Sequence, residues 1–232
     1  MKRALIAILS ISIIIACTST PELPATQPSI STDARLQATS ESVSASPAAT
    51  DSVAVSTIAA PEDGFFSEMG ISLPAPVCSV ATQQQTEGPY YTPDTPERNS
   101  LIEEGMQGTR LIVVGYVLDQ NCQPLSNAWL DFWQADANGE YDNAGFALRG
   151  HQFADAQGRY FLETVRPGEY PGRTEHIHVK VQPSGGSVTT TQLYFPDVFS
   201  NQGDGIFEPT LIVQLEDRGD YLLAYFNFVV PT

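Results

Sequence analysis

Hydrophobic and polar residues alternate along several short stretches between residues 110 and 230. These stretches are rich in β-branched and aromatic residues, and an alternation with a period of two is typical of strands that are buried on one face. Turn-forming pairs such as Asn138-Gly139 and Pro167-Gly168 separate them. The predicted strands span residues 110–118, 128–134, 159–165, 176–181, 189–195, 210–215 and 221–230.

Seven or so short strands with turns at this spacing predict an all-β fold, an antiparallel β-sandwich. The one candidate for a helix is residues 100–105, which is at most a turn or two. We expect the sandwich domain to span residues 74–232, a length at which one domain can bury a substantial core.

The first residues have a different pattern. Lys2 and Arg3 precede a largely apolar run over residues 4–16, which is too short for a permanent membrane span and matches the apolar region of a secretory signal peptide. The run ends at Cys17 in a sequence that resembles the lipobox of bacterial lipoproteins, in which the cysteine is lipidated. We therefore expect a signal peptide over residues 1–16 and a lipid anchor on Cys17. An ordinary cleaved signal with a chance cysteine is the alternative.

Residues 17–73 contain mainly Ser, Thr, Ala and Pro with scattered acids, and they show little apolar periodicity. Such a segment buries too little apolar surface to offset the entropy of ordering, so we expect a disordered tether. A tether after a lipid anchor would hold the sandwich domain clear of the membrane. The expected location is thus outside the cytoplasm, as a membrane-anchored lipoprotein on the cell surface or facing the periplasm.

Charge and cysteine content narrow the possible partners. The formal net charge is −16, and the only lysines are Lys2 and Lys180, which argues against nucleic acid as a partner. The acidity by itself indicates no more than solubility. Apart from Cys17, the chain contains two cysteines, Cys78 and Cys122, and in an exported domain two cysteines favour a disulfide.

Two histidines in one predicted strand suggest metal chemistry. Within residues 176–181, His176 and His178 leave the same face of the strand, and two imidazoles at this spacing can bind one metal ion. Because His151 is the only other histidine, some remaining ligands must be of another type, and Tyr170 in the preceding turn is the nearest candidate. The alternative is a polar strand face with a tyrosine in a loop.

Several motifs occur in the order found in the intradiol ring-cleavage dioxygenases, and the chain resembles that family over roughly residues 86–205. Each motif alone is weak, but together they are specific. They are Glu87-Gly88-Pro89-Tyr90-Tyr91, Gly115-Tyr116-Val117, the stretch from Asn127 to Tyr141, Asp155-Ala156-Gln157-Gly158-Arg159-Tyr160-Phe161, Pro167-Gly168-Glu169-Tyr170, Arg173 with His176 and His178, and Thr191-Gln192-Leu193-Tyr194-Phe195.

The resemblance implies a non-haem ferric iron bound by Tyr141, Tyr170, His176 and His178. This donor set suits the ion, because a free phenol ionises near pH 10 and a phenolate ligand therefore requires a strongly Lewis-acidic cation. Two phenolates and a hydroxide would cancel the three positive charges, and neutral imidazoles would complete the coordination.

The resemblance also implies the reaction. A small aromatic diol of the catechol type and dioxygen would be the substrates, and the ring would be cleaved between its two hydroxylated carbons to a muconate-type dicarboxylate. Tyr170 would leave the iron and accept a substrate proton, and Arg173 and Gln192 would stabilise negative charge near the ring. Pro89 and Tyr90 would lie beside the substrate.

Two departures from the cytoplasmic catechol dioxygenases leave the substrate and the subunit arrangement open. The predicted tether stands in place of their helical dimerisation region, and the loop from Tyr170 to Arg173 is shorter than theirs. Gly172 in this loop offers no side chain as a pocket wall.

Two other functions fit part of the pattern. One is a non-catalytic surface binding module with a transthyretin-like sandwich. The other is a metal hydrolase that uses His176 and His178 with a carboxylate such as Glu175 or Asp197. For His151 the sequence gives no role beyond that of a surface or loop histidine.

Overall fold

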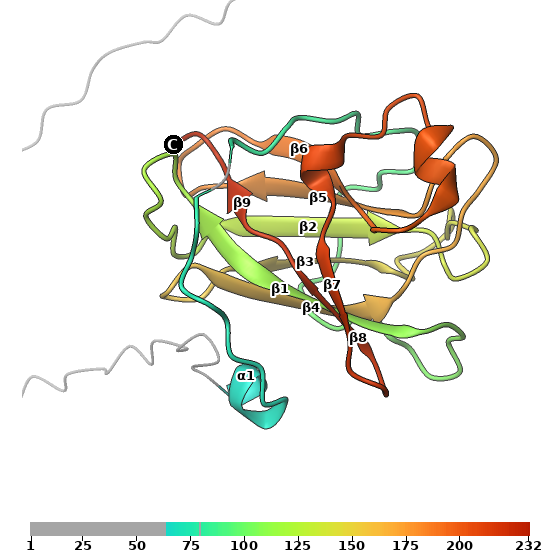
Figure 1. Ribbon diagram of the computed structural model, residues 1–232, viewed down its shortest axis with the longest axis horizontal. Helices are drawn as coiled ribbons and strands as arrows, with labels where there is room; N and C mark the ends of the chain where they lie inside the picture. Colours follow the sequence, from blue (N-terminus) through green and yellow to red (C-terminus); the bar gives the residue numbers. More distant parts are fainter. Residues whose placement is uncertain (1–63, 79) are drawn as a thin grey trace, which may run out of the picture. The chain divides into compact units, whose positions relative to one another are not determined.

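A computed structural model describes residues 64–78 and 80–232 of the chain (Figure 1). The predicted signal peptide, Cys17 and most of the predicted tether lie outside the described residues. Within the part that the structure describes, no helix is long and apolar enough to cross a membrane.

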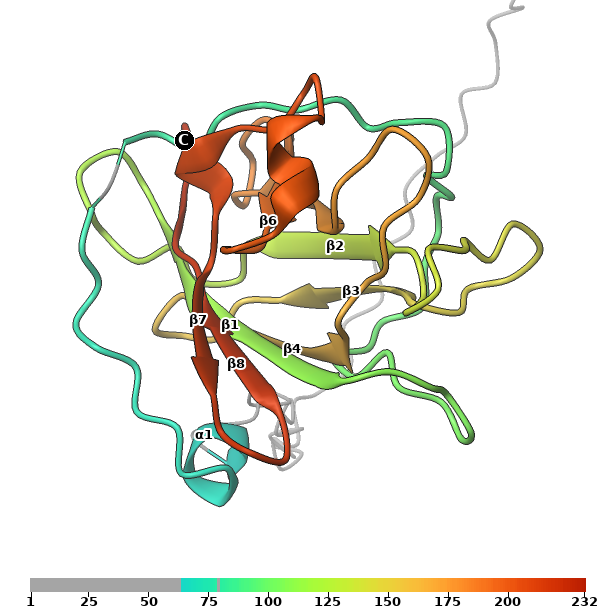
Figure 2. The ribbon, with the colours of Figure 1, turned by 45° about the vertical axis from the view of Figure 1, so that its right-hand side comes forward.

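Strands dominate the described residues, as the hydrophobic pattern predicts, and they form two sheets (Figures 1 and 2). The elements in chain order are α1 (Gly64–Glu68), β1 (Arg110–Leu118), β2 (Trp129–Gln134), β3 (Arg149–Phe153), β4 (Arg159–Val165), β5 (His176–Gln182), β6 (Thr189–Tyr194), the 3-10 helices η1 (Phe199–Gln202) and η2 (Pro209–Leu211), β7 (Gln214–Asp217), β8 (Leu222–Tyr225) and β9 (Phe228–Val229).

The two sheets confirm the predicted all-β sandwich. One sheet has the order β3-β2-β5-β6, and all of its pairings are antiparallel. The other has the order β4-β1-β8-β7, with β9 also paired to β1. It is a mixed sheet, because β1 runs parallel to both β8 and β9, so the antiparallel prediction holds strictly for the first sheet only.

The core lies between the sheets and follows from the alternation in each strand. In β5, Ile177, Val179 and Val181 are fully buried in the main apolar cluster, together with Leu130 and Phe132 of β2. Each such side chain contributes about 1.5–3 kcal/mol by leaving water. The same alternation sends the polar residues of β2 and β5 to the outer face of the four-stranded sheet.

The outer face of the five-stranded sheet carries a second, smaller apolar cluster. Ile112 and Val114 of β1 lie there, and residues 64–73 cover them, with Ile71 buried and Phe65 stacked on Phe161 at 3.5 Å between ring centroids. The last ten residues of the predicted tether thus include α1 and contact the sheet, because their apolar side chains pack against the apolar outer face of β1. The local sequence of the tether does not indicate this contact.

A disulfide joins Cys78 and Cys122, whose Cα atoms are 5.3 Å apart. It connects the segment before the domain's first strand to the turn after β1. Since the two cysteines are 44 residues apart, the chain-entropy account gives a stabilisation of about 4 kcal/mol.

Four local predictions differ from the structure. Residues 100–105 form no helix and contain only a turn, because the side chain of Leu101 is drawn into the core and its backbone N–H bonds to Glu163 of β4. Residues 210–215 divide between η2 and β7 rather than forming one strand. Residues 221–230 divide into β8 and β9, which pair with different parts of β1. The strand β3 is not predicted, since its sequence Arg-Gly-His-Gln-Phe shows no apolar alternation and its pairing with β2 holds it in place.

Candidate active site

The outer face of the four-stranded sheet brings the predicted histidines next to aromatic and amide side chains. His178 of β5 is in register with Trp133 of β2 on one side and with Gln192 of β6 on the other. His176 is in register with Tyr194 of β6. All five side chains are almost fully buried although they lie on the outer face of a sheet, so another part of the chain must cover them.

The covering segment is residues 85–98, which we call the crossing segment. It pairs with the edge strand β6 at its start, where the Gln85 N–H donates to the Thr190 carbonyl, and with the opposite edge strand β3 near its end, where the Arg98 N–H donates to the His151 carbonyl. Between these points the chain crosses the outer face of the sheet.

The two imidazoles present their Nε2 atoms to each other at 3.1 Å. Nδ1 of His176 donates to the Thr174 carbonyl at 2.6 Å, which leaves the Nε2 lone pair of the neutral ring free to bind a cation. The ring of His178 stacks on Trp133 at 4.8 Å and 8°. Burial, and then the charge of Arg173, lower the pKa of His176 to about 4. Burial, and then the interaction with His176, hold the pKa of His178 well below its usual value. Both rings are therefore neutral at physiological pH.

Two tyrosines reach the same point from two loops. The Tyr141 hydroxyl, in the loop after β2, lies 3.5 Å from Nε2 of His176 and is hydrogen-bonded to Tyr170 in the turn before β5. Burial, followed by the interaction with Tyr170, raises the pKa of Tyr141 far above its usual value, and burial also raises the pKa of Tyr170. Neither phenol ionises in this environment unless a cation compensates the charge.

Close contact between two glycine-containing turns makes the tyrosines converge. The Gly168 N–H donates to the Asp136 carbonyl at 2.7 Å. A Cβ atom on Gly139 would lie 2.1 Å from the Glu169 carbonyl oxygen, and one on Gly168 would lie 2.5 Å from the Ala137 carbonyl oxygen. Because no side chain fits at either position, the two turns meet backbone to backbone, directly before Tyr141 in one and Tyr170 in the other.

The loop that carries Tyr141 is tied to the sheet by Arg149, the first residue of β3. Its Nη2 donates to the Asp142 carbonyl at 2.7 Å, and its Nη1 donates to the Tyr90 carbonyl at 2.6 Å. The Asp142 carboxylate accepts the N–H groups of Ala144, Gly145 and Ala147, each at 2.9 Å. Arg149 thereby fixes the Tyr141 loop and the crossing segment relative to one another.

Arg173 lies beside Tyr170 and is held on two sides. Its Nη1 donates to the Tyr170 hydroxyl at 3.3 Å, its Nε donates to Asp204 at 2.9 Å, and its Nη2 donates to the Gln192 side-chain oxygen. Burial would lower the pKa of Arg173, but the hydrogen bond to Asp204 and the charge of that carboxylate raise it overall. Gln192 is fully buried, and its amide donates to the Thr86 carbonyl at 2.9 Å.

Tyr90 forms a wall of the site. Its ring stacks on Tyr141 with 4.3 Å between centroids and meets the edge of Tyr170 at 6.2 Å. Pro89, the residue before Tyr90, is exposed in the turn. Gly88, one residue earlier, lies so close to His178 that a Cβ atom on Gly88 would be 3.4 Å from Cε1 of His178.

A buried carboxylate anchors the crossing segment. Asp131 of β2 accepts hydrogen bonds from Thr95 Oγ1 at 2.7 Å and from the Tyr91 hydroxyl at 3.0 Å. Lys180, beside Asp131 on the sheet, forms an ion pair with Glu87 at 2.6 Å and lies 3.3 Å from the Tyr91 ring centroid. His151 belongs to this anchor, since its Nδ1 lies 2.7 Å from the Thr95 carbonyl oxygen.

Four donors thus surround one point, namely the Nε2 atoms of His176 and His178 and the hydroxyls of Tyr141 and Tyr170. Separations of 3.1 and 3.5 Å between neighbouring donors suit ligands that each lie about 2 Å from one ion. The four side chains therefore fit a metal ion whose charge is high enough to ionise the phenols.

Among the residues that the structure describes, no group of three or more His, Cys, Asp or Glu side chains is arranged to hold a metal ion. Glu175, the carboxylate next to His176, is bound to Arg166 at 2.6 Å. The histidines instead meet phenols.

Sequence reasoning missed Arg149, Asp204, Asp131 and the stacking role of Trp133. Arg149 begins a strand that the pattern does not predict, and Asp204 is 31 residues from its partner Arg173. Asp131 lies among apolar residues in β2, and a charged residue within a largely apolar strand is the one signal in the sequence for the anchor.

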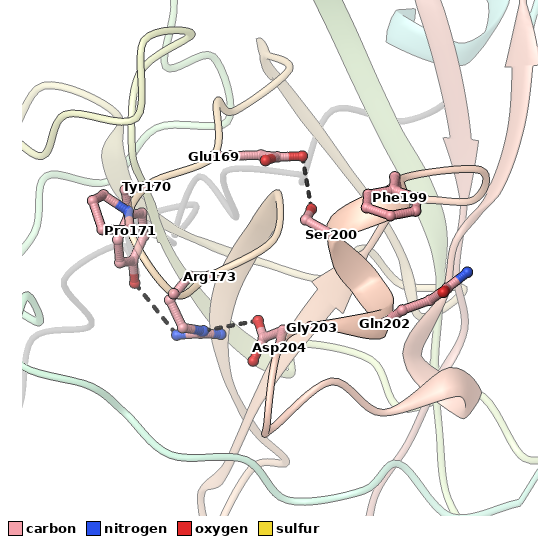
Figure 3. Close-up of a pocket in the computed structure, with 10 residues that line it drawn as sticks. Glu169, Tyr170, Pro171, Arg173, Phe199, Ser200, Gln202, Gly203 and Asp204 are labelled. Atoms are coloured by element: carbon pink, nitrogen blue, oxygen red, sulfur yellow. Dashed lines mark hydrogen bonds and ion pairs between the residues drawn. The ribbon is translucent and has the colours of Figure 1, made fainter.

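A pocket of about 730 Å³ opens beside Tyr170 and Arg173 (Figure 3). It lies between the turn that carries these two residues and the segment that begins with η1, where Ser200 donates a hydrogen bond to Glu169 (Figure 3). The pocket therefore adjoins the four donors on the side of Tyr170.

Comparison with known proteins gives one consistent result. A family model described as "Dioxygenase" matches residues 86–221. The dioxygenase domain of a dioxygenase carbohydrate-binding protein fusion from Streptomyces sp. SirexAA-E is 49% identical with a TM-score of 0.64, over 66% of this chain and 99% of that one. An intradiol ring-cleavage dioxygenase from Tetranychus urticae is 26% identical with a TM-score of 0.60, over 66% of this chain and 95% of that one.

Among curated proteins, the protocatechuate 3,4-dioxygenase beta chain of Burkholderia cepacia is 35% identical over 49% of this chain and 56% of its own length. The catechol 1,2-dioxygenase of Candida albicans is 28% identical over 56% of this chain and 52% of its own. The chain thus spans about half the length of these curated relatives.

Proposed function

Since the chain belongs to the dioxygenase family whose model matches residues 86–221, we propose that it is an intradiol ring-cleavage dioxygenase with a non-haem ferric ion. Its substrates would be a small aromatic diol of the catechol type and dioxygen. Cleavage between the two hydroxylated carbons, with both oxygen atoms inserted, would give a muconate-type dicarboxylate. The observation that carries the proposal is the convergence of two phenols and two neutral imidazoles on one point.

Tyr141, Tyr170, His176 and His178 would hold the ion. Burial raises the pKa of both tyrosines, so the phenolates need a strongly charged cation, and ferric iron meets this need better than zinc or ferrous iron. When bound, the ferric ion would bring the two substrates together and polarise them.

The side chains around the ion divide the remaining tasks. The phenolate oxygen of Tyr170 is the base that takes a proton from a catechol hydroxyl, and Nη1 of Arg173, 3.3 Å away, stabilises negative charge at that place. Gln192 and Asp204 keep the guanidinium in position. The ring of Tyr90 and the turn at Pro89 would form one wall for the substrate ring.

Metal analysis and a visible absorption spectrum of the purified protein, with oxygen uptake on catechol, test this function. Ferric iron bound by phenolates gives a charge-transfer band, and isotopically labelled dioxygen should place both of its atoms in the product. Zinc and no colour would favour a hydrolase. Binding of catechols without oxygen uptake would favour a transthyretin-like binding module.

The proposed cellular setting is that of an exported lipoprotein, with residues 1–16 removed and Cys17 lipidated. The support is the charged start, the apolar run and the lipobox-like sequence. The substitution Cys17→Ser should move the protein from the membrane to the soluble fraction. A wild-type protein found in the soluble fraction with an unmodified Cys17 would overturn the anchor without touching the proposed chemistry.

A further inference from the structure

The pocket beside Tyr170 is larger than a bare catechol ring needs. Its volume is about 730 Å³, whereas a cavity of about 150 Å³ holds benzene. Tyr170 and Arg173 line both the pocket and the candidate active site, so a ring held beside Tyr170 can direct a substituent into the pocket. At Gly172, in the pocket wall, a Cβ atom would meet nothing within 4 Å.

The charges around the pocket are unequal. Among the described residues that line it, Arg173 is the only cation, and it is bound to Asp204 at 2.9 Å. Glu169, directly before Tyr170 in the turn, is exposed, and one of its oxygens accepts a hydrogen bond from Ser200 of η1 at 2.7 Å. A negatively charged substituent would therefore meet an uncompensated carboxylate and no available cation.

The facing wall of the pocket carries an exposed aromatic ring. Phe199 is the residue before Ser200, and 86% of its surface is accessible. An exposed ring and a carboxylate on facing walls of one pocket, joined by the Ser200–Glu169 hydrogen bond, form a favourable environment for an alkylammonium group, through cation–π attraction and charge pairing. They also offer apolar contact to a neutral alkyl chain.

We propose that this pocket receives the ring substituent of the catechol and selects it by charge, with aminoalkyl preferred to alkyl and alkyl preferred to carboxyalkyl. The residues that select are Glu169 and Phe199. The proposal rests on the proposed function for the position of the ring, and it adds the class of substituent.

Three catechols with an aminoethyl, an ethyl or a carboxymethyl group at the same ring position test this order. Their dissociation constants are measured by calorimetry with the full-length protein under nitrogen, so that the measurement does not depend on turnover. We expect about tenfold tighter binding of the aminoethyl than of the carboxymethyl compound at low salt. The ratio should shrink in high salt, because the Debye length falls to about 3 Å at 1 M.

Two variants separate the contributions of Glu169 and Phe199 to this selection. Glu169→Gln should reduce the ratio between the aminoethyl and carboxymethyl compounds to about twofold. Phe199→Ala should weaken the aminoethyl and ethyl compounds by about threefold relative to unsubstituted catechol. The matched control is Glu216→Gln, which removes a carboxylate from β7 in the other sheet and should leave the ratio unchanged.

The outcomes distinguish this proposal from the proposed function. Equal binding of the three compounds, or a ratio that Glu169→Gln leaves unchanged, would overturn the charge selection even if catechol is cleaved. Loss of the ratio in the Glu216→Gln control would do the same, because the selection would then reflect net charge alone. If catechols are bound in the expected order but none consumes oxygen, the charge selection stands and the proposed function fails.

Discussion

The two loops that supply the tyrosines differ in how firmly the fold holds them. Tyr141 is more deeply buried than Tyr170, stacks on Tyr90, and lies in the loop that is fixed by Arg149 and by the three backbone N–H groups on Asp142. Tyr170 lies in the short turn that ends at Arg173, borders the pocket, and contacts Arg173 through a longer bond of 3.3 Å.

This difference supports unequal roles for the two chemically identical side chains in the proposed iron site. A ligand on the rigid loop is suited to remain bound and to define the site, because its displacement would break the contacts of Arg149. A ligand beside an open pocket is suited to move away and to take a proton, because little else must rearrange. Variants of Tyr141, Tyr170 and Arg149 test this difference in the roles of the two tyrosines.

The largest effect is expected for Tyr141→Phe. Removal of the hydroxyl takes away a charged ligand that no neighbouring group can replace, so the protein should lose most of its iron, its visible colour and its oxygen uptake together. Metal content per protein and the absorption spectrum measure this. Full iron occupancy in this variant would contradict the role given to the rigid loop.

For Tyr170→Phe we expect iron and catechol binding to persist while kcat falls by about 10²- to 10⁴-fold, the usual range for removal of a general base. Spectra recorded with and without catechol under nitrogen, together with single-turnover rates, measure this. If catechol displaces Tyr141 and leaves Tyr170 bound in the wild type, the roles proposed for the two tyrosines are wrong.

Arg149→Met should loosen the rigid loop while leaving the ligand itself in place. The carbonyls of Asp142 and Tyr90 lose their donors, and loss of such an outer support lowers metal affinity by about 10- to 100-fold. Competition with a chelator measures the affinity. Arg218→Met, at an exposed ion pair with Glu216, is the control and should leave the affinity unchanged. If the two variants retain iron equally, Arg149 is not a support of the site.

The smallest effect concerns the anchor beneath the crossing segment. Burial raises the pKa of Asp131 despite the hydrogen bonds from Thr95 and Tyr91. A carboxyl group whose pKa is raised on folding destabilises the folded state as the pH rises from its ordinary value of 3.8 through the raised pKa. Asp131→Asn should therefore remove part of the loss of stability over that pH range, which denaturant titrations at several pH values can detect. An unchanged pH profile would show that Asp131 does not contribute in this way.

The sequence alone determined the strands whose side chains alternate. The limits of β1 and β4 agree with the prediction, and β2, β5 and β6 differ by one residue at one end. The alternation in β5 also determined that His176 and His178 share a face, because successive side chains of a strand point to opposite sides. The motif order supplied Tyr141 and Tyr170 as their companions.

Tertiary structure alone decided what holds these residues together. The strand β3 exists because β2 pairs with it, and Arg149 acts on two segments that are far from it in sequence. The parallel pairing of β8 with β1, the contact of Asp204 with Arg173 and the crossing segment over the outer face likewise join residues distant along the chain. Local alternation reports which face of an element is buried, whereas the partner that buries it depends on how all the strands pack, and no local pattern encodes that.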